Sequence, residues 1–400
     1  MHRYRTLLAL PGARAPMLLS IAGSMPIGMF GLAILLLVHD ATGSFAVAGR
    51  VLGAFSLANA FGAVAQGRLM DRLGQGLVLR TAAGCHLPAC VALVIAAHDG
   101  APVWLLTAIA LCGGATIPQL PAAMRSLWST LAETDAQRET AYAVLAITFE
   151  IAVVTAPAIV ALVVAVSSPA VAMVGAASLG VGSAVAFTLT PASRRWRGAR
   201  HAVGWLGPLV APGMRTVFAV LLAFGTAVGV IQVAVPAFAL ARGSESLGGV
   251  LLAALSLGSL LGGVAYGARS WPGGLAARLA LVMLGIGVAF ALLTIPAAYL
   301  PLALLLVASG TLFAPASVIG STLLDTVAPA GTMTEAFAAM VMAIVAGTAV
   351  GNAIGGAVVE SASYDAAVLA ATGIAVLGSF VALLRRRTLT PMATAAGTTR

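Results

Sequence analysis

The sequence predicts an all-α integral membrane protein whose twelve transmembrane helices form two pseudo-symmetric six-helix bundles. Three observations lead to this fold class: the composition, the spacing of the apolar runs, and an internal repeat. Of the 400 residues, 60% are hydrophobic and only 8% are charged, whereas a soluble globular domain carries about 25% charged residues. The polar side chains are too few to cover the surface of a soluble protein of this length. Lipid must therefore be the solvent for most of the chain.

The apolar runs have the length that a membrane crossing requires, which is about 20 residues. Twelve candidate spans follow in order, at residues 15–38, 46–66, 78–97, 103–124, 140–166, 170–190, 214–240, 247–267, 275–294, 301–324, 334–358 and 364–384. The first run is longer than the apolar core of a cleaved signal peptide, so we expect it to be a retained helix.

The positions of the basic residues predict the orientation. All 21 are arginines, and if the N-terminus is cytoplasmic, only Arg50 and Arg242 fall on the far side. The positive-inside rule demands such a bias, so we expect a bacterial inner (cell) membrane protein with both termini cytoplasmic. Topology thus explains the net charge of +9 without nucleic acid. Between spans six and seven, Arg194 and its neighbours are expected to bind anionic lipid headgroups, with Trp196 and Trp205 at the interface.

An internal repeat relates the two halves of the chain. When residues 52–67 are shifted by 200 positions, eight of the sixteen residues are identical, among them Gly62 and Gly262. The repeat divides the chain into an N-terminal bundle (1–190), a cytoplasmic central loop (191–213), and a C-terminal bundle with a cytoplasmic tail (214–400). Repeated halves of this kind are typical of transporters, which bind substrate near the midplane between them.

A short motif lies between spans two and three, where the sequence reads GRLMDRLG from Gly67 to Gly74. It resembles the GxxxDRxG loop signature of the major facilitator superfamily, at the place where that family carries it. The twelve spans, the repeat and the basic central loop agree with this resemblance. The resemblance implies a transporter, and we expect an efflux-type one. It also implies that Gly67, Asp71, Arg72 and Gly74 form a latch that closes the cytoplasmic side when the transporter opens outward.

Elementary chemistry suggests what the motif residues do. Gly67 and Gly74 would permit a tight turn. Asp71 would lie near the start of span three, where a helix N-terminus stabilises a carboxylate. Arg125, at the inner end of span four, is the candidate partner of Asp71. The alternative is that Asp71 and Arg72 only fix a solvated turn.

Few polar side chains lie within the spans. Glu150 is about ten residues into span five and therefore near the midplane. A carboxylate there costs about 2.5–3.5 kcal/mol on insertion scales, which favours a role in proton coupling or substrate binding; the alternative is a structural hydrogen bond between helices. Four amides are further substrate candidates, each equally able to bond a neighbouring helix: Asn59, Gln119, Gln232 and Asn352. His86 in span three is expected to be a packing histidine.

The sequence contains no HExxH, GxSxG or P-loop motif, so we expect neither an enzyme nor a metal or other cofactor. The apolar lining favours a secondary transporter that exports a small amphipathic or hydrophobic compound by alternating access, with protons as the candidate coupling ion. We also expect a monomer. One alternative is a facilitator or importer of a neutral metabolite such as a sugar. Another, of a different class, is a transport-dead membrane sensor or assembly partner.

Overall fold

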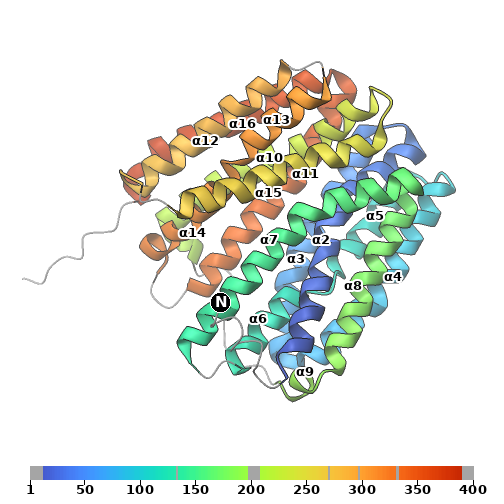
Figure 1. Cartoon of the computed structure of the whole chain (residues 1–400), viewed down its shortest axis with the longest axis vertical. Helices are drawn as coiled ribbons and strands as arrows, with labels where there is room; N and C mark the ends of the chain where they lie inside the picture. Colours follow the sequence, from blue (N-terminus) through green and yellow to red (C-terminus); the bar gives the residue numbers. More distant parts are fainter. Residues whose placement is uncertain are drawn as a thin grey trace, which may run out of the picture.

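The computed structural model describes residues 12–131, 134–196, 208–268, 271–295, 298–329 and 333–389, and within these ranges the secondary structure is entirely helical (Figure 1). Eleven helices in the described residues are long and apolar enough to cross a membrane. Another long helix, α7 (Asp135–Val166), occupies the position of the predicted fifth span. The all-helical membrane fold predicted from the sequence is therefore confirmed.

The N-terminal bundle holds six spans, of which the fourth is divided into two helices. Besides α7, its elements are α2 (Arg14–Thr42), α3 (Phe45–Leu73), α4 (Gln75–His98), α5 (Val103–Ala115), α6 (Leu120–Leu131), α8 (Pro169–Leu189) and the short α9 (Pro191–Arg195).

The C-terminal bundle repeats this plan, again with a divided fourth span. Its elements are α10 (Pro212–Leu240), α11 (Glu245–Gly267), α12 (Leu275–Ala291), α13 (Tyr299–Gly310), α14 (Phe313–Val327), α15 (Met333–Ser361) and α16 (Tyr364–Leu384), with short 3-10 turns at Pro208–Val210, Leu292–Thr294 and Arg386–Leu389.

The repeat seen in the sequence is also a repeat of helix packing. In the N-terminal bundle, a Cβ added at Gly62 would lie 2.8 Å from the Cα of Ala115. In the C-terminal bundle, a Cβ added at Gly262 would lie 2.5 Å from the Cα of Thr311. Only glycine allows backbones to approach so closely. The matched pair Gly62 and Gly262 therefore presses each second span onto the point where the fourth span of its own bundle is interrupted.

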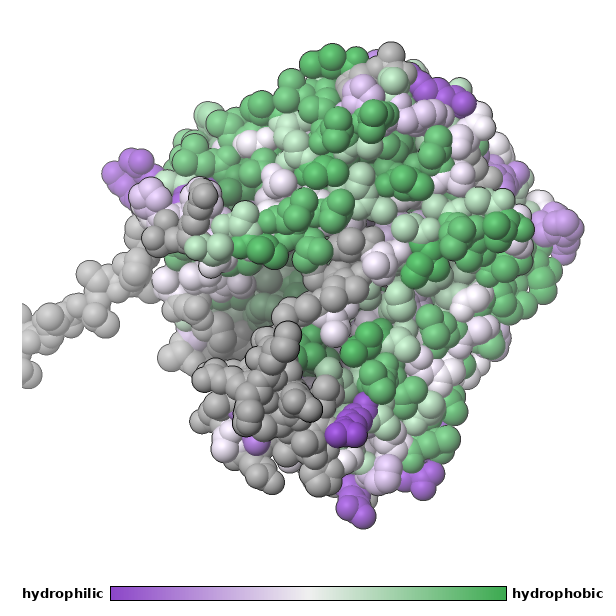
Figure 2. Space-filling model, in the orientation of Figure 1, coloured by the Kyte–Doolittle hydropathy of each residue, from purple (hydrophilic) through white to green (hydrophobic). Residues whose placement is uncertain are grey.

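The surface divides into an apolar flank and polar ends. Large exposed hydrophobic side chains, such as Leu281 and Leu377, lie near the middle of their helices, and Figure 2 shows hydrophobic residues over much of the flank that faces the viewer. We call the face at which α2 begins and α3 ends the basic face, because Arg14 and Arg72 lie there. The other is the opposite face. An apolar flank between polar rims is the surface that a bilayer requires.

The two bundles meet at the opposite face. There α3 packs on α15 and α11 packs on α7. A Cβ added at Gly49 of α3 would lie 3.1 Å from the Cα of Gly356 on α15. One added at Gly249 of α11 would lie 2.6 Å from the Cβ of Ala161 on α7. The bundles thus touch backbone to backbone, through small residues, at this end.

Toward the basic face the bundles diverge, at the lower left of Figure 1, and Figure 2 shows a hollow between them. The described apolar core follows the same division. One core runs through both bundles and includes Val47, Val160 and Leu251 from the opposite end. A second, separate core, which includes Leu120 and Phe187, belongs to the basic end of the N-terminal bundle alone. The structure is therefore closed at the opposite face and separated at the basic face.

Candidate functional site

The fourth span of the N-terminal bundle is interrupted near its middle. Helix α5 ends at Ala115 and α6 begins at Leu120, with Pro118 between them. Because proline has no amide hydrogen and the segment is not helical, carbonyl groups are left without their helical partners. The Nε2 atom of Gln66, on α3, donates to the carbonyl oxygens of Ala115 and Ile117 at 3.0 and 2.9 Å. One side chain thus satisfies two carbonyls exposed by the interruption.

Three amides gather at this interruption. The Nε2 atom of Gln119 donates to Oδ1 of Asn59 at 3.0 Å and to the carbonyl of Ile117 at 3.1 Å. The backbone N–H of Gln119 donates to Oε1 of Gln66 at 3.3 Å. Gln66 and Gln119 are buried, whereas Asn59 is only half-buried. We call Asn59, Gln66 and Gln119 the amide cluster.

Two of the amides predicted from the sequence therefore lie together, and the sequence analysis missed the third. Gln66 follows Asn59 by seven residues, which is two turns of α3 and places both on one helix face. That spacing was the signal that could have identified it. In the C-terminal bundle, the positions related by the 200-residue shift are Ser259 and Tyr266. The repeat preserves the interruption but not the amides.

The other two predicted amides lie elsewhere, on the C-terminal bundle. Asn352 is almost fully buried on α15, between α3 and α10: Gly49 and Gly229 both pack against its backbone. Its Oδ1 atom has no hydrogen-bond partner among the described residues. Gln232 is half-buried on α10, three residues after Gly229. Asn352 therefore belongs to the junction of the bundles rather than to the amide cluster.

The predicted coupling residue, Glu150, lies on α7, but its side chain is outside the part of the chain that the structure describes. Its role in coupling stays a prediction.

The motif between spans two and three has a tighter geometry than expected. Helix α3 continues through Gly67 and Asp71 to Leu73, and α4 begins at Gln75. Gly74 alone makes the turn, with a φ of 89°, a left-handed value that favours glycine. The expectation that Gly67 shapes the turn is wrong, because it is helical with open space where a Cβ would be.

Asp71 lies exposed in the last turn of α3, four residues before α4 begins at Gln75. A helix C-terminus does not stabilise a carboxylate, so Asp71 gains nothing from the dipole of its own helix. Arg72 is exposed beside it. The pairing of Asp71 with Arg125 stays a prediction.

Arg125 makes a contact between the bundles. Its guanidinium carbon lies 5.4 Å from the centroid of the Phe337 ring, on α15. This distance is within the range of a cation–π interaction. Arg125 is on α6 and Phe337 is on α15, so this side-chain contact bridges the two bundles on the basic side, where their helices diverge.

Two further side chains, His86 and Trp196, are buried within the N-terminal bundle and lie within hydrogen-bond distance of backbone carbonyls. His86 is buried, and its Nδ1 lies 2.9 Å from the carbonyl oxygen of Gly113, which agrees with a packing role. Trp196 was expected at the membrane interface. Instead it is buried against the N-terminal bundle, where its indole N–H donates to the carbonyl of Ser126 at 3.2 Å. Trp205 lies outside the described residues.

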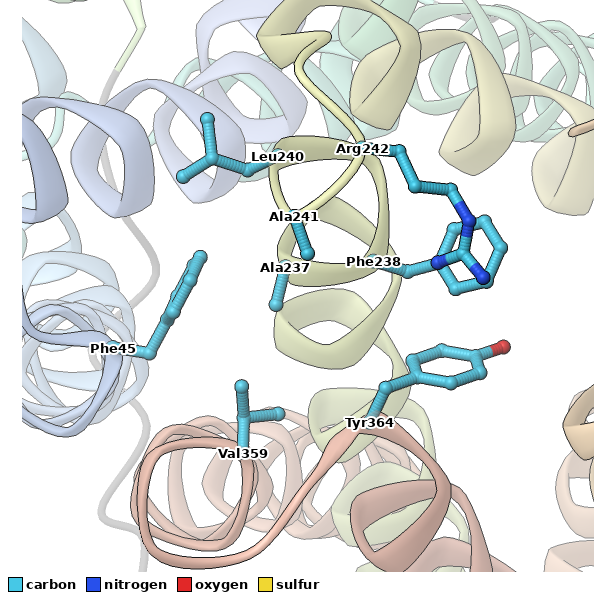
Figure 3. A pocket seen from close by; sticks show the side chains of 8 residues that line it. All are labelled: Phe45, Ala237, Phe238, Leu240, Ala241, Arg242, Val359 and Tyr364. Atoms are coloured by element: carbon cyan, nitrogen blue, oxygen red, sulfur yellow. The ribbon is translucent and has the colours of Figure 1, made fainter. Parts of the chain in front are cut away.

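A pocket of about 360 Å³ opens at the opposite face, where the bundles meet (Figure 3). The side chains of Phe45 from α3, Val359 from α15 and Tyr364 from α16 line it. Beside them, the guanidinium of Arg242 lies 3.6 Å from the centroid of the Phe238 ring. Among the described residues, no group of three or more His, Cys, Asp or Glu side chains could hold a metal ion.

Comparisons with known proteins give a consistent result. The family model described as Major Facilitator Superfamily matches residues 17–343. No curated protein matches the sequence. Among solved structures, the nucleoside transporter NupG is similar with a TM-score of 0.70 and 16% identity, over 94% of this chain and 99% of that one.

Two other solved structures illustrate the breadth of the likeness. An auto-inhibited peptide transporter of the POT family has a TM-score of 0.68 and 14% identity, over 96% of this chain and 99% of its own. The human organic anion transporter MFSD10 has a TM-score of 0.62 and 17% identity, over 93% of this chain and 99% of its own. At these identities the likeness concerns the fold.

Proposed function

Because this chain belongs to the major facilitator superfamily, we propose that it exports a small amphipathic or hydrophobic compound from the bacterial cytoplasm by alternating access. The coarser conclusion, a membrane transporter with the fold of secondary transporters, follows from the family match and the fold. The direction, the substrate class and the coupling are the proposal.

The orientation is the first step of the proposal. Of the arginines that the structure describes, only Arg50 and Arg242 lie at the opposite face. The positive-inside rule therefore supports a cytoplasmic basic face. With this orientation, the structure is the state whose substrate site faces the cytoplasm. A cytoplasmic compound would then enter between the bundles.

The amide cluster is the observation that carries the proposal. It lies at an interruption near the middle of a span, which is where transporters of this architecture bind substrate. The half-buried Asn59 amide can donate and accept hydrogen bonds but carries no charge. A mostly apolar molecule with one or two neutral polar groups matches such a site. A phosphate or carboxylate would instead call for a basic residue.

The same amides also support a second candidate, the import or facilitated passage of a neutral metabolite. Paired amides such as Asn59 and Gln119 can bond sugar hydroxyls or the edges of a nucleobase. The direction of transport and its dependence on a gradient separate the two candidates.

Coupling is proposed to involve protons at Glu150. Glu150 follows Thr140 by ten residues in the sequence, which supports a position near the midplane of the predicted fifth span. A group there that alternates between charged and neutral forms would link proton and substrate movement. The Asp71 motif is proposed to hold the cytoplasmic side closed when the transporter is open outward.

The test is transport into sealed inside-out vesicles, in which export appears as uptake. A panel of lipophilic dyes, labelled nucleosides and labelled sugars is measured with and without an imposed pH gradient. Gln119→Leu should lower uptake of the transported compound, and Glu150→Gln should abolish its dependence on the gradient. Gln75→Leu is the matched control, since Gln75 is a buried amide outside the cluster that donates to Ala123 at 3.0 Å.

The outcomes separate the candidates. Gradient-driven dye uptake that is lost in Glu150→Gln supports a proton-coupled exporter. Sugar or nucleoside movement that ignores the gradient supports a facilitator and returns Glu150 to a structural role. No movement of any compound, with correct membrane insertion, contradicts transport of these classes and favours a sensor.

A further inference from the structure

A carboxylate joins the two bundles at the opposite face. Glu360 is near the end of α15, in the C-terminal bundle, and its Oε2 atom accepts hydrogen bonds from the N-cap and the first turn of α3, in the N-terminal bundle. The hydroxyl of Ser44 donates to it, and the backbone N–H of Ala46 donates at 2.8 Å. Glu360 is exposed, at the edge of the junction. From these contacts we propose that Glu360 is a latch that holds the opposite face closed.

The chemistry suits a latch. The first N–H groups of a helix have no partner within the helix, and the N-terminus favours negative charge. Glu360 supplies both the missing acceptor and the charge, but from the other bundle. An ordinary helix cap is supplied by its own chain segment. A cap supplied across the junction exists only while the bundles are together.

The latch can also open without leaving α3 uncapped. Ser44 is the N-cap of α3, and its side-chain oxygen accepts from the N–H of Val47 at 3.1 Å. When Glu360 withdraws, this bond remains and water can reach the N–H of Ala46. The carboxylate, which is already exposed, is then hydrated rather than buried. The contact therefore favours the closed state without blocking its reversal.

Beside Glu360, the backbones of α15 and α3 pack closely against each other. Gly356 lies one turn before Glu360, and a Cβ added there would lie 3.0 Å from the carbonyl carbon of Phe45 and 3.2 Å from the Cα of Ala46. Other charged or titratable groups close to Glu360 are His39 and Arg50. The ring of His39 stacks on Phe45, with centroids 3.9 Å apart. The close packing of small residues thus brings α15 near enough to α3 for Glu360 to accept the hydrogen bonds from Ser44 and Ala46.

The pocket in Figure 3 lies beside this contact. Phe45, next to Ser44, and Val359, next to Glu360, come from different bundles and both line the pocket. Parting of the bundles at the latch would therefore widen the pocket into an opening toward the opposite face. This inference rests on the proposed alternating-access function, and it identifies one contact that regulates it.

The test measures opening directly rather than transport. Spin labels are placed at Asp99→Cys and Ala298→Cys, in a background where the three native cysteines are replaced. Both positions are exposed turns at the opposite face, one in each bundle. Distances between the labels are measured for the full chain in lipid nanodiscs, without substrate.

We expect Glu360→Ala to raise the population with separated labels by roughly three- to tenfold, as loss of an exposed charge-assisted contact implies. Glu360→Gln keeps an acceptor of the same size but loses the charge, so its shift should be smaller. The matched control is Asp365→Ala, an exposed carboxylate in the first turn of α16 on the same face. It should leave the distances unchanged.

Wild-type distances in correctly folded Glu360→Ala and Glu360→Gln would overturn the latch, as would an equal shift in Asp365→Ala. The result is independent of the proposed substrate. Shifted distances in a protein that moves none of the tested compounds keep the latch and contradict the proposed export. Export of a tested compound, together with unshifted distances in the Glu360 variants, supports the proposed function and contradicts the latch.

Discussion

The glycine contact between α11 and α7 gives the sharpest prediction about alternating access. Gly249, on α11, faces the N-terminal bundle. A Cβ at this position would lie 2.6 Å from the Cβ of Ala161, 2.6 Å from the carbonyl oxygen of Pro157 and 2.8 Å from Cδ2 of Leu32. Two of these atoms are on α7 and one is on α2, so the change Gly249→Ala inserts a methyl group between the bundles.

The size of the effect follows from the distances. Ordinary van der Waals contact begins near 3.4 Å, so 2.6 Å leaves a shortfall of about 0.8 Å that α11 and α7 must make up by separating. Overpacking of this kind costs about 1–3 kcal/mol. The cost falls on the closed state alone, because the contact disappears when the bundles part. The closed-to-open equilibrium should therefore shift about 5- to 150-fold toward opening.

Alanine also favours the helix by up to about 1 kcal/mol over glycine, but it does so in both states. This term partly offsets any loss of stability and does not move the equilibrium between states.

The assay is the distance distribution between labels at Asp99→Cys and Ala298→Cys. Two glycine variants serve as controls. Gly373→Ala, on α16, meets nothing within 4 Å and should behave as wild type. Gly258→Ala, on α11, would place a Cβ 3.0 Å from the Cα of Gly310 in its own bundle. It should lower the melting temperature without shifting the distances.

A wild-type distance distribution in Gly249→Ala would refute the reasoning, because it would mean that the junction absorbs the methyl group without opening. An equal shift in Gly258→Ala would refute it as well, since the effect would then come from general loosening.

Three further predictions concern the basic side and the amide cluster. Gln66→Leu removes the donor to the two carbonyls of the interrupted span, so it should lower the free energy of unfolding by about 1–3 kcal/mol, seen as a lower melting temperature in detergent. Asp71→Asn should lower the initial rate of transport while surface labelling shows normal membrane insertion; full transport would argue against a latch at this motif. Phe337→Ala removes the ring beneath Arg125, a contact worth about 0.5–1 kcal/mol when exposed. It should increase the fraction of molecules in which labels on the two bundles are far apart at the basic face. Unchanged distances would show that the contact does not hold the bundles together.

Several features of this protein could be determined from its sequence. The lipid-facing surface follows from composition, since 8% charged residues could not cover a soluble protein. The 200-residue shift that matches Gly62 with Gly262 predicted the two repeated six-helix bundles. The family signature was also correctly recognised, because the family model matches residues 17–343.

Other features depended on the tertiary structure, because they are contacts between residues far apart in the chain. Helix periodicity does not reveal that α3 runs on through Gly67 and turns only at Gly74, since both glycines are compatible with either geometry. The use of Gln66 as a cap for broken backbone needed the fourth span beside it. The bond from Ala46 to Glu360 joins residues more than 300 positions apart. Which end of the molecule is closed is decided by such contacts between bundles, and no local pattern of a sequence contains them.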